Sequence, residues 1–101
     1  MDMHLEHQQD KSTIYVDKNQ LLGLEAAELQ NNILDSIEKG SKDITIDMSK
    51  VDYVTSWGIG MLVHSFTTCT NRNINFSLTG VSDRVNSILS KVKLQTIFNI
   101  R

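Results

Sequence analysis

The chain has 101 residues, the size of one domain with its own hydrophobic core, and we expect a single domain over residues 1–101. The formal net charge is -2 and the lysines and arginines form no run, so composition argues against nucleic acid or a membrane surface as a partner. A single cysteine, and an N-terminus without the basic and apolar regions of a signal peptide, indicate a cytoplasmic protein.

The first forty residues predict two strands and a helix. Residues 3–7 alternate weakly between apolar and polar, and residues 12–16 are rich in β-branched and aromatic side chains, so the two segments are expected to form a hairpin. Between residues 23 and 39 apolar residues recur at steps of three and four, which is typical of an amphipathic helix. Glu25 is expected on another face of this helix. Its predicted apolar stripe is Leu22, Ala26, Leu29, Ile33 and Ile37.

The rest of the chain alternates between strands and helices. Residues 43–48 and 74–79 are apolar at every second position, so each is predicted to be a strand with one buried face. One helix is expected from Gly58, and another after Ser82, a residue type typical of the N-cap. Residues 97–100 predict a last strand. The apolar stripes of the two helices are Ile59, Leu62, Val63, Phe66 and Cys69 for the first, and Val85, Ile88, Leu89 and Val92 for the second.

This order of elements predicts the α/β fold class. Strands that alternate with helices favour a mixed, mostly parallel sheet, because parallel neighbours need crossover connections. The N-terminal β-hairpin would add a strand at one edge, and three amphipathic helices would complete the domain.

Two adjacent hydroxyls, Thr55 and Ser56, follow the short extended segment 52–54 and precede the second helix. Ligands and modifications gather at such strand-to-helix junctions in open α/β sheets. A phosphate at a helix start is favoured by roughly 0.3–1 kcal/mol. Alternatively, Ser56 caps the helix by accepting a hydrogen bond from a following amide, which is worth about 1 kcal/mol. On residue type alone capping is the commoner role, and both interpretations stay open.

Trp57 comes directly after the two hydroxyls. A large aromatic side chain here either folds back onto the sheet or projects as a docking anchor, since tryptophan is enriched in interface hot spots. The sequence does not decide between these two positions.

No other group of residues predicts catalysis, a metal or a cofactor. His4, His7 and His64 are not spaced as metal ligands, and Cys69 falls among apolar helix positions, where it is expected to pack as a small hydrophobic residue. The segment Gly58-Ile-Gly60 lacks the lysine of a phosphate-binding loop. We therefore expect a protein that is not an enzyme and holds neither a metal nor a cofactor.

The stretch from Asp47-Met-Ser49 to Ser56-Trp-Gly-Ile-Gly60 resembles the core of the STAS domain in bacterial anti-sigma factor antagonists. That family has a strand ending in Asp-Leu-Ser, followed after an apolar step by Asp-Ser-Ser/Thr-Gly-Leu-Gly. Leu78-Thr-Gly-Val-Ser82 also resembles the closing half of the family. This chain departs from the pattern at two places, since Thr55 stands where the family has aspartate and Trp57 where it has serine or threonine. The family also adds another helix at the position where this sequence stops.

The resemblance implies a partner-switching protein rather than an enzyme. Ser56 matches the serine that the family's partner kinase phosphorylates, with Thr55 as the alternative acceptor. The unphosphorylated chain would bind a serine kinase/anti-sigma factor and be released by phosphorylation, with a phosphatase as a further partner and transcription regulation as the output. The docking surface that the resemblance implies consists of Thr55, Ser56, Trp57, Gly58, Ile59 and Met61.

Two further expectations follow from the departures. Without an acid beside the acceptor, the chain would alternatively be a constitutive interaction module that docks through Trp57 with no phosphorylation. Without the family's last helix, an uncovered apolar patch would favour self-association, so we expect a monomer or a weak dimer.

Overall fold

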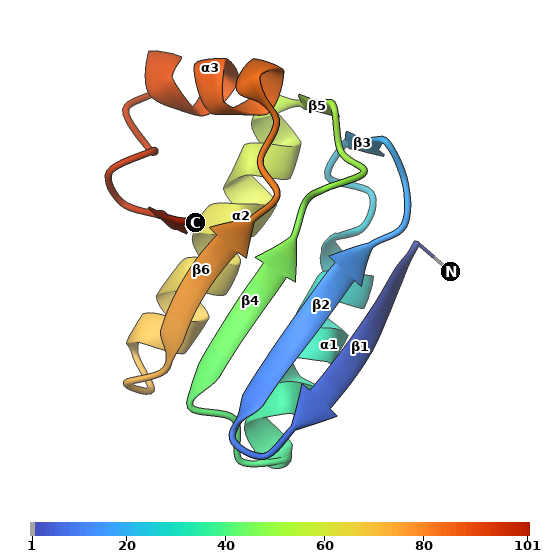
Figure 1. Ribbon diagram of the computed structural model, residues 1–101, viewed down its shortest axis with the longest axis vertical. Helices are drawn as coiled ribbons and strands as arrows, with labels where there is room; N and C mark the ends of the chain where they lie inside the picture. The colour runs from blue at the N-terminus through green and yellow to red at the C-terminus, as the bar shows by residue number, and fades with distance from the viewer. Residues whose placement is uncertain (1) are drawn as a thin grey trace.

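Five strands form the main sheet, in the order β1-β2-β4-β6-β7 (Figure 1). The structure is a computed structural model that describes residues 2–101. Strand β1 is antiparallel to β2, and all other neighbours in this sheet are parallel, so the predicted α/β class with a mixed, mostly parallel sheet is confirmed. The strands are β1 (Met3–Gln8), β2 (Lys11–Val16), β4 (Asp43–Asp47), β6 (Asn75–Thr79) and β7 (Asn99–Ile100).

The alternation of side chains places one face of the sheet against the helices. Ile44 and Ile46 of β4 point into the core and are fully buried, as is Met48 just beyond the strand. Strand β6 departs from the predicted single buried face, because Ser77 is buried together with its apolar neighbours. Ser77 lies on the opposite face, between two neighbouring strands, and its hydroxyl is 3.0 Å from that of Thr45, so its burial is satisfied.

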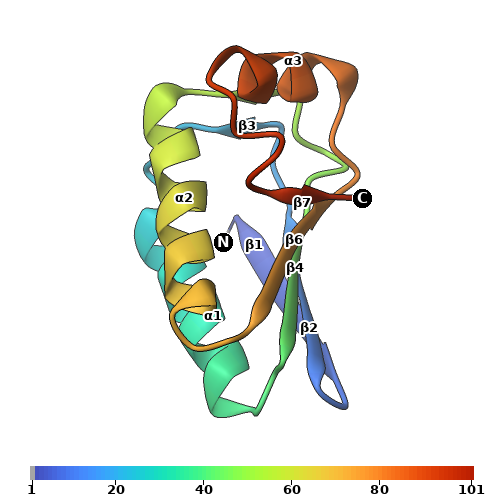
Figure 2. The same cartoon turned by 90° about the vertical axis from the view of Figure 1, so that its left-hand side faces the viewer.

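Helices α1 (Ala26–Glu38) and α2 (Ser56–Thr70) cover the apolar face (Figure 2). The predicted stripe of α1 is wrong at its N-terminal end, where Ala26 is exposed and Glu25 is buried. The helix begins at Ala26 rather than Gly23, so the buried face is set by Glu25, Leu29, Ile33 and Ser36 instead. Helix α2 ends where predicted, and Asn73 takes the left-handed conformation with φ 58°.

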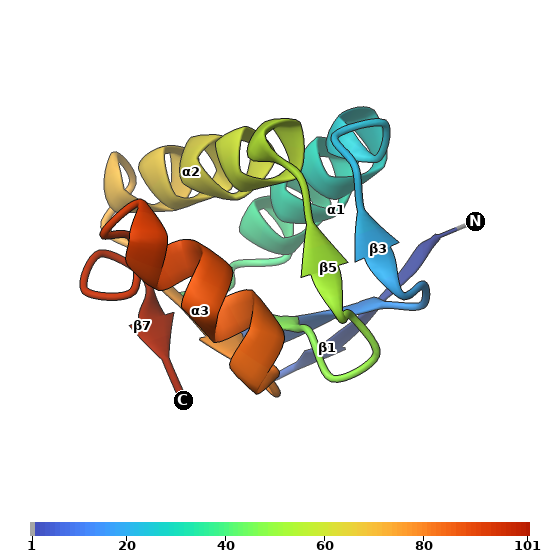
Figure 3. The same ribbon diagram turned by 90° about the horizontal axis from the view of Figure 1, so that it is seen from above.

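Helix α3 (Asp83–Lys91) lies across the end of the sheet at which the parallel strands terminate (Figures 1 and 3). Ser82 caps it as predicted, accepting a hydrogen bond of 3.1 Å from the Val85 amide. The predicted stripe is wrong at Val92, which is exposed because the helix has already ended at Lys91. In residues 92–101 the described chain forms β7 and no further helix.

The last strand is shorter than predicted, since only Asn99 and Ile100 pair with β6. Phe98, just before it, is buried and completes an aromatic cluster with Phe66 and Phe76, with ring centroids 6.0–6.1 Å apart. These three rings close the core on the β7 side of the sheet, although Ile97 beside them stays exposed.

A second, two-stranded sheet sits above the main one, formed by β3 (Gln20–Leu21) and β5 (Tyr53–Val54) in parallel (Figure 3). A two-residue strand carries no periodicity, so β3 could not be predicted from the sequence. Pairing Leu21 with Val54 brings the segments that follow the two strands side by side. One of these segments leads into α1 and the other into α2, so the small sheet places the two helix starts together.

Candidate functional site

Thr55, not Ser56, caps helix α2. The Thr55 backbone is extended, with φ -82° and ψ 170°, and its hydroxyl accepts a hydrogen bond of 3.1 Å from the Gly58 amide. Ser56 is therefore the first helical residue, and the interpretation of Ser56 as the cap is wrong. Its side chain is exposed, and within residues 2–101 its hydroxyl forms no hydrogen bond to another residue. The capping bond is thus made by the preceding threonine, and the Ser56 hydroxyl is exposed beside it.

Contact with β3 fixes the position of this helix start. The Thr55 amide donates to the carbonyl oxygen of Leu21 at 2.9 Å. A Cβ on Gly58 would come within 2.4 Å of that same oxygen, so only glycine fits there. Gly58 is consequently buried under the first turn and offers no surface to a partner, in contrast to the prediction. Gly60 is exposed, and a Cβ there would meet nothing within 4 Å.

Two more residues of the predicted docking surface lie elsewhere. Met61 is only 6% exposed and packs in the core, because five residues along a helix turn it well away from the direction of Ser56. Ile59 is partly buried and packs against the core. The predicted surface is thus reduced to Thr55, Ser56 and Trp57, with Ile59 at its border.

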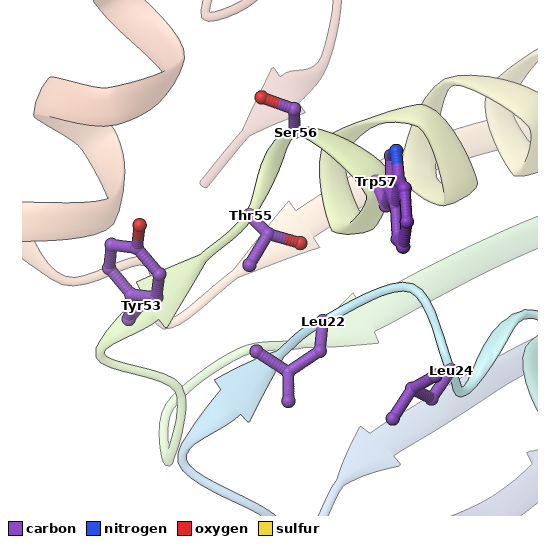
Figure 4. Close-up of a pocket in the computed structure, with 6 residues that line it drawn as sticks. All are labelled: Leu22, Leu24, Tyr53, Thr55, Ser56 and Trp57. Carbon is purple, nitrogen blue, oxygen red and sulfur yellow. The ribbon is translucent and has the colours of Figure 1, made fainter.

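A shallow hollow of about 520 Å³ lies beside Ser56 (Figure 4). Trp57 is 78% exposed and Leu24 is 80% exposed, so the tryptophan projects from the helix and the alternative in which it folds back is wrong. Exposed apolar side chains of this size beside one another are typical of interaction sites. The hollow is lined by Leu22, Leu24, Tyr53, Thr55, Ser56 and Trp57.

Leu22, Leu24 and Tyr53 were not among the predicted site residues. They come from the two segments that β3 and β5 bring together, and Tyr53 lies 29 positions after Leu24 in the chain. Leu24 carried one local signal, since it is an apolar residue outside the buried stripe of α1. That signal alone does not say which surface the residue joins.

The carboxylate of Glu25 binds the backbone of residues 22–24, the segment that carries Leu22 and Leu24. It accepts hydrogen bonds from the amides of Leu22 at 3.1 Å and Gly23 at 3.0 Å, and from the Lys18 ammonium at 2.5 Å. Burial acts to raise the pKa of Glu25, but the Lys18 bond and the backbone amides outweigh it, so the pKa lies below its ordinary value. The buried group therefore stays ionised and paired.

Gly23 then sets the spacing to α2. Its φ is 98°, which favours glycine, and a Cβ there would lie 2.6 Å from the Cβ of Trp57. Glu25 and Gly23 together press the segment that carries Leu24 against the first turn of α2. Helical periodicity does not predict this role of Glu25, because its partners Lys18, Leu22 and Gly23 lie before the helix begins.

The charges around the hollow are few. The first turn of α2 has no acidic residue, so nothing there opposes added negative charge. The Arg84 guanidinium lies over the Tyr53 ring, 5.3 Å from its centroid. Asp47 is occupied in the turn after β4, where it accepts from the Ser49 amide at 2.9 Å and from the Ser49 hydroxyl at 2.6 Å.

Across residues 2–101 no three His, Cys, Asp or Glu side chains gather in a way that could hold a metal ion. No helix in that range is long and apolar enough to cross a membrane. Cys69 is buried as predicted, and burial raises the pKa of its thiol to about 11.

A sequence model of the STAS domain family matches residues 3–101. No curated protein sequence gives a significant match. Among solved structures, a putative anti-sigma factor antagonist from Thermotoga maritima is similar at 21% identity and a TM-score of 0.83, covering 97% of this chain and 84% of that chain. A sulfate transporter family protein from Wolinella succinogenes is similar at 22% identity and a TM-score of 0.80, covering 91% and 74%. The phosphorylated form of the Bacillus cell fate determinant SpoIIAA is similar at 14% identity and a TM-score of 0.72, covering 98% and 90%.

At these identities the likeness to solved structures is one of fold. The same fold occurs in proteins named as anti-sigma factor antagonists and in one named for sulfate transport. The residues around Ser56, rather than the fold, must therefore support any particular function.

Proposed function

Because this chain belongs to the STAS domain family, we propose that it is a phosphorylation-controlled partner-switching protein, an anti-sigma factor antagonist. In its unphosphorylated form it binds a serine kinase/anti-sigma factor, and phosphorylation of Ser56 releases it. A phosphatase would restore the binding form. The structural likeness to anti-sigma factor antagonists supports this choice of partner class.

The observation that carries the proposal is the free, exposed hydroxyl of Ser56 at the first position of α2. In the kinase complex, the Ser56 oxygen attacks the γ-phosphorus of ATP and forms the new phosphorus–oxygen bond. The bond to the bridging oxygen breaks, ADP leaves, and the hydroxyl proton passes to a base of the kinase. Thr55 is the poorer acceptor, because its oxygen already caps the helix.

The docking surface that we propose centres on Ser56 and Trp57, with Leu22, Leu24 and Tyr53 around them. A partner that covers Trp57 and Leu24 removes water from Ser56 as well, because all three line one hollow. A phosphoryl group adds about 1.5 to 2 negative charges at that point. Burying this charge in an apolar contact, or placing it against a like charge, costs several kcal/mol, which corresponds to more than a hundredfold in affinity.

The direct test is to incubate the chain with ATP and the serine kinase/anti-sigma factor of the same bacterium, followed by mass spectrometry. We expect one phosphate, located on Ser56, and none on the Ser56→Ala variant. Thr55→Ala is the matched control and should still be modified. Phosphate that is absent from the parent chain, or present equally in Ser56→Ala, would refute the assignment.

A second candidate is a constitutive interaction module of the same fold. The exposed pair Leu24 and Trp57 favours it, since an apolar anchor needs no phosphate to bind. In this case the chain binds its partner through Trp57 without being phosphorylated, and Trp57→Ala lowers partner affinity by about 2 kcal/mol or more. Incubation with the kinase and ATP separates the candidates, because a constitutive module stays unmodified while its affinity, measured by calorimetry, still depends on Trp57.

A further inference from the structure

We propose that Arg84 is the internal partner of a phosphoryl group on Ser56, and that it leaves the Tyr53 ring to form this pair. The proposal rests on the proposed function in one respect, which is that Ser56 carries the phosphate. On this proposal phosphorylation changes the docking surface in two ways. It adds negative charge at Ser56, and it uncovers the ring of Tyr53, which lines the same hollow.

Arg84 has a positive charge that is not neutralised in the structure. It lies in the first turn of α3, and its guanidinium is held over the face of the Tyr53 ring at 5.3 Å from the centroid. No carboxylate in residues 2–101 comes within 4.0 Å of it, even though Asp83 precedes it on α3 and Asp52 precedes Tyr53 on the other segment. By contrast, Lys18 is already paired with Glu25.

Arg84 is connected to the site through Tyr53, because its guanidinium lies over a ring that lines the same hollow as Ser56. Helix α3 packs against β5, and β5 leads directly into Ser56 (Figure 3). The Ser56 oxygen points away from Trp57 (Figure 4), so a phosphoryl group there extends away from the aromatic anchor. Tyr53, over which Arg84 lies, lines the same hollow as Ser56. A rotation of the flexible arginine side chain is the movement that the pair requires.

The phosphate is a stronger partner for the Arg84 guanidinium than the Tyr53 ring is. A guanidinium matches a phosphate with parallel, charge-assisted hydrogen bonds, which are stronger and more directional than an exposed contact with an aromatic face. The phosphate also lies at the N-terminus of α2, whose amides favour negative charge, so it stays in place to receive the arginine. Once Arg84 has moved, the Tyr53 ring loses its cover, and a partner that docked on Tyr53 and Arg84 loses that contact.

The test uses the full chain with phosphoserine installed at position 56 by genetic incorporation, so that no kinase is needed. The midpoint of the phosphate titration is followed by ³¹P NMR, and the ring signals of Tyr53 are followed by ¹H NMR with and without the phosphate. Arg84→Gln removes the proposed partner. Lys91→Gln removes the same charge from the far end of α3 and is the matched control, and Arg84→Lys keeps the charge without the planar guanidinium.

We expect the titration midpoint of Arg84→Gln to lie about half a pH unit above that of the parent, with Arg84→Lys in between and Lys91→Gln close to the parent. Phosphate should shift the Tyr53 ring signals in the parent and much less in Arg84→Gln. The proposal is overturned if Arg84→Gln and Lys91→Gln titrate alike, or if phosphate shifts the Tyr53 signals equally in parent and Arg84→Gln. Because no kinase takes part, a failure of Ser56 phosphorylation by a partner would leave this result standing, and the reverse also holds.

Discussion

Helices α2 and α3 begin in the same way and present different chemistry. Each has a hydroxyl N-cap in extended conformation, Thr55 and Ser82, that accepts a bond of 3.1 Å from the amide three residues on. The next residue is the neutral Ser56 in α2 and the acidic Asp83 in α3. An acid at this position is already stabilised by the helix start. Helix α2 thus has no charge at its first position, where α3 has an acid, and phosphorylation of Ser56 would place negative charge there.

The first turns of α2 and α3 also differ in the residue that donates the capping hydrogen bond and in what that residue contacts. The amide donor in α3 belongs to Val85, a buried core side chain, whereas in α2 it belongs to Gly58, which lies against the Leu21 carbonyl. The amide that the α3 cap binds thus belongs to a residue of the core, while the α2 cap lies beside an exposed hydroxyl and an exposed tryptophan. Identical local capping is therefore compatible with different surroundings at the two helix starts.

The largest expected effect comes from placing an acid at the first position of α2, as α3 has at Asp83. In Ser56→Asp the first helical position becomes acidic, and we expect partner affinity to fall more than a hundredfold, whereas Ser56→Ala keeps parent affinity. The fold should be as stable as the parent or more so by roughly 0.3–1 kcal/mol, because the acid is favoured at a helix start. Calorimetry gives the affinities and urea unfolding the stability; equal affinities for the two variants would contradict the switch.

The next effect tests the close contact between Gly58 of α2 and the Leu21 carbonyl oxygen, which has no counterpart at the start of α3. Gly58→Ala places a methyl group within 2.4 Å of the Leu21 carbonyl oxygen and should destabilise the fold by about 1–3 kcal/mol. Gly60→Ala is the matched control on the same helix; its methyl meets nothing, and it should be neutral or stabilising by up to about 1 kcal/mol. Thermal unfolding measures both, and equal midpoints for the two variants would argue against the contact with β3.

Removal of each cap should have a smaller and similar effect. Thr55→Ala and Ser82→Ala each remove one capping bond of the same length, so each should lower the free energy of unfolding by about 1 kcal/mol. Ser56→Ala should change it little, because the Ser56 hydroxyl bonds to no residue of the described chain. If Ser56→Ala cost as much as Thr55→Ala in urea unfolding, Ser56 rather than Thr55 would be the cap in solution.

The smallest effect is a pH dependence that comes from Glu25, whose carboxylate binds the backbone of the segment beside α2. The pKa of Glu25 is lower in the folded chain than its ordinary value of 4.5, so its stabilising contribution is present above that value and is lost as pH falls through the folded pKa. Urea unfolding at decreasing pH should therefore show a loss of stability that Glu25→Gln lacks. Glu38→Gln, which changes an exposed acid at the other end of α1, should keep the loss.

Local sequence patterns predicted the parts of the fold that depend on neighbouring residues. Apolar alternation located β4, the Asn71-Arg-Asn73 segment located the end of α2, and Ser82 was identified as the cap of α3. The resemblance in motif indicated the STAS family, which the match over residues 3–101 confirms. Met61 and Gly58 were placed on the docking surface because the motif contains them, although the turn of the helix buries both.

The sequence alone determined the α/β order of elements, the family, and a pair of hydroxyls at a helix start. The tertiary structure decided which hydroxyl is free. Thr55 caps α2 because its amide, and Gly58 three residues on, are held against the carbonyl of Leu21, which lies 34 positions before Thr55. The same pairing of β3 with β5 brings Leu24 beside Trp57 and leaves Ser56 exposed between the apolar hollow and α3. Long-range strand pairing has no local periodicity, so these positions follow only from the folded chain.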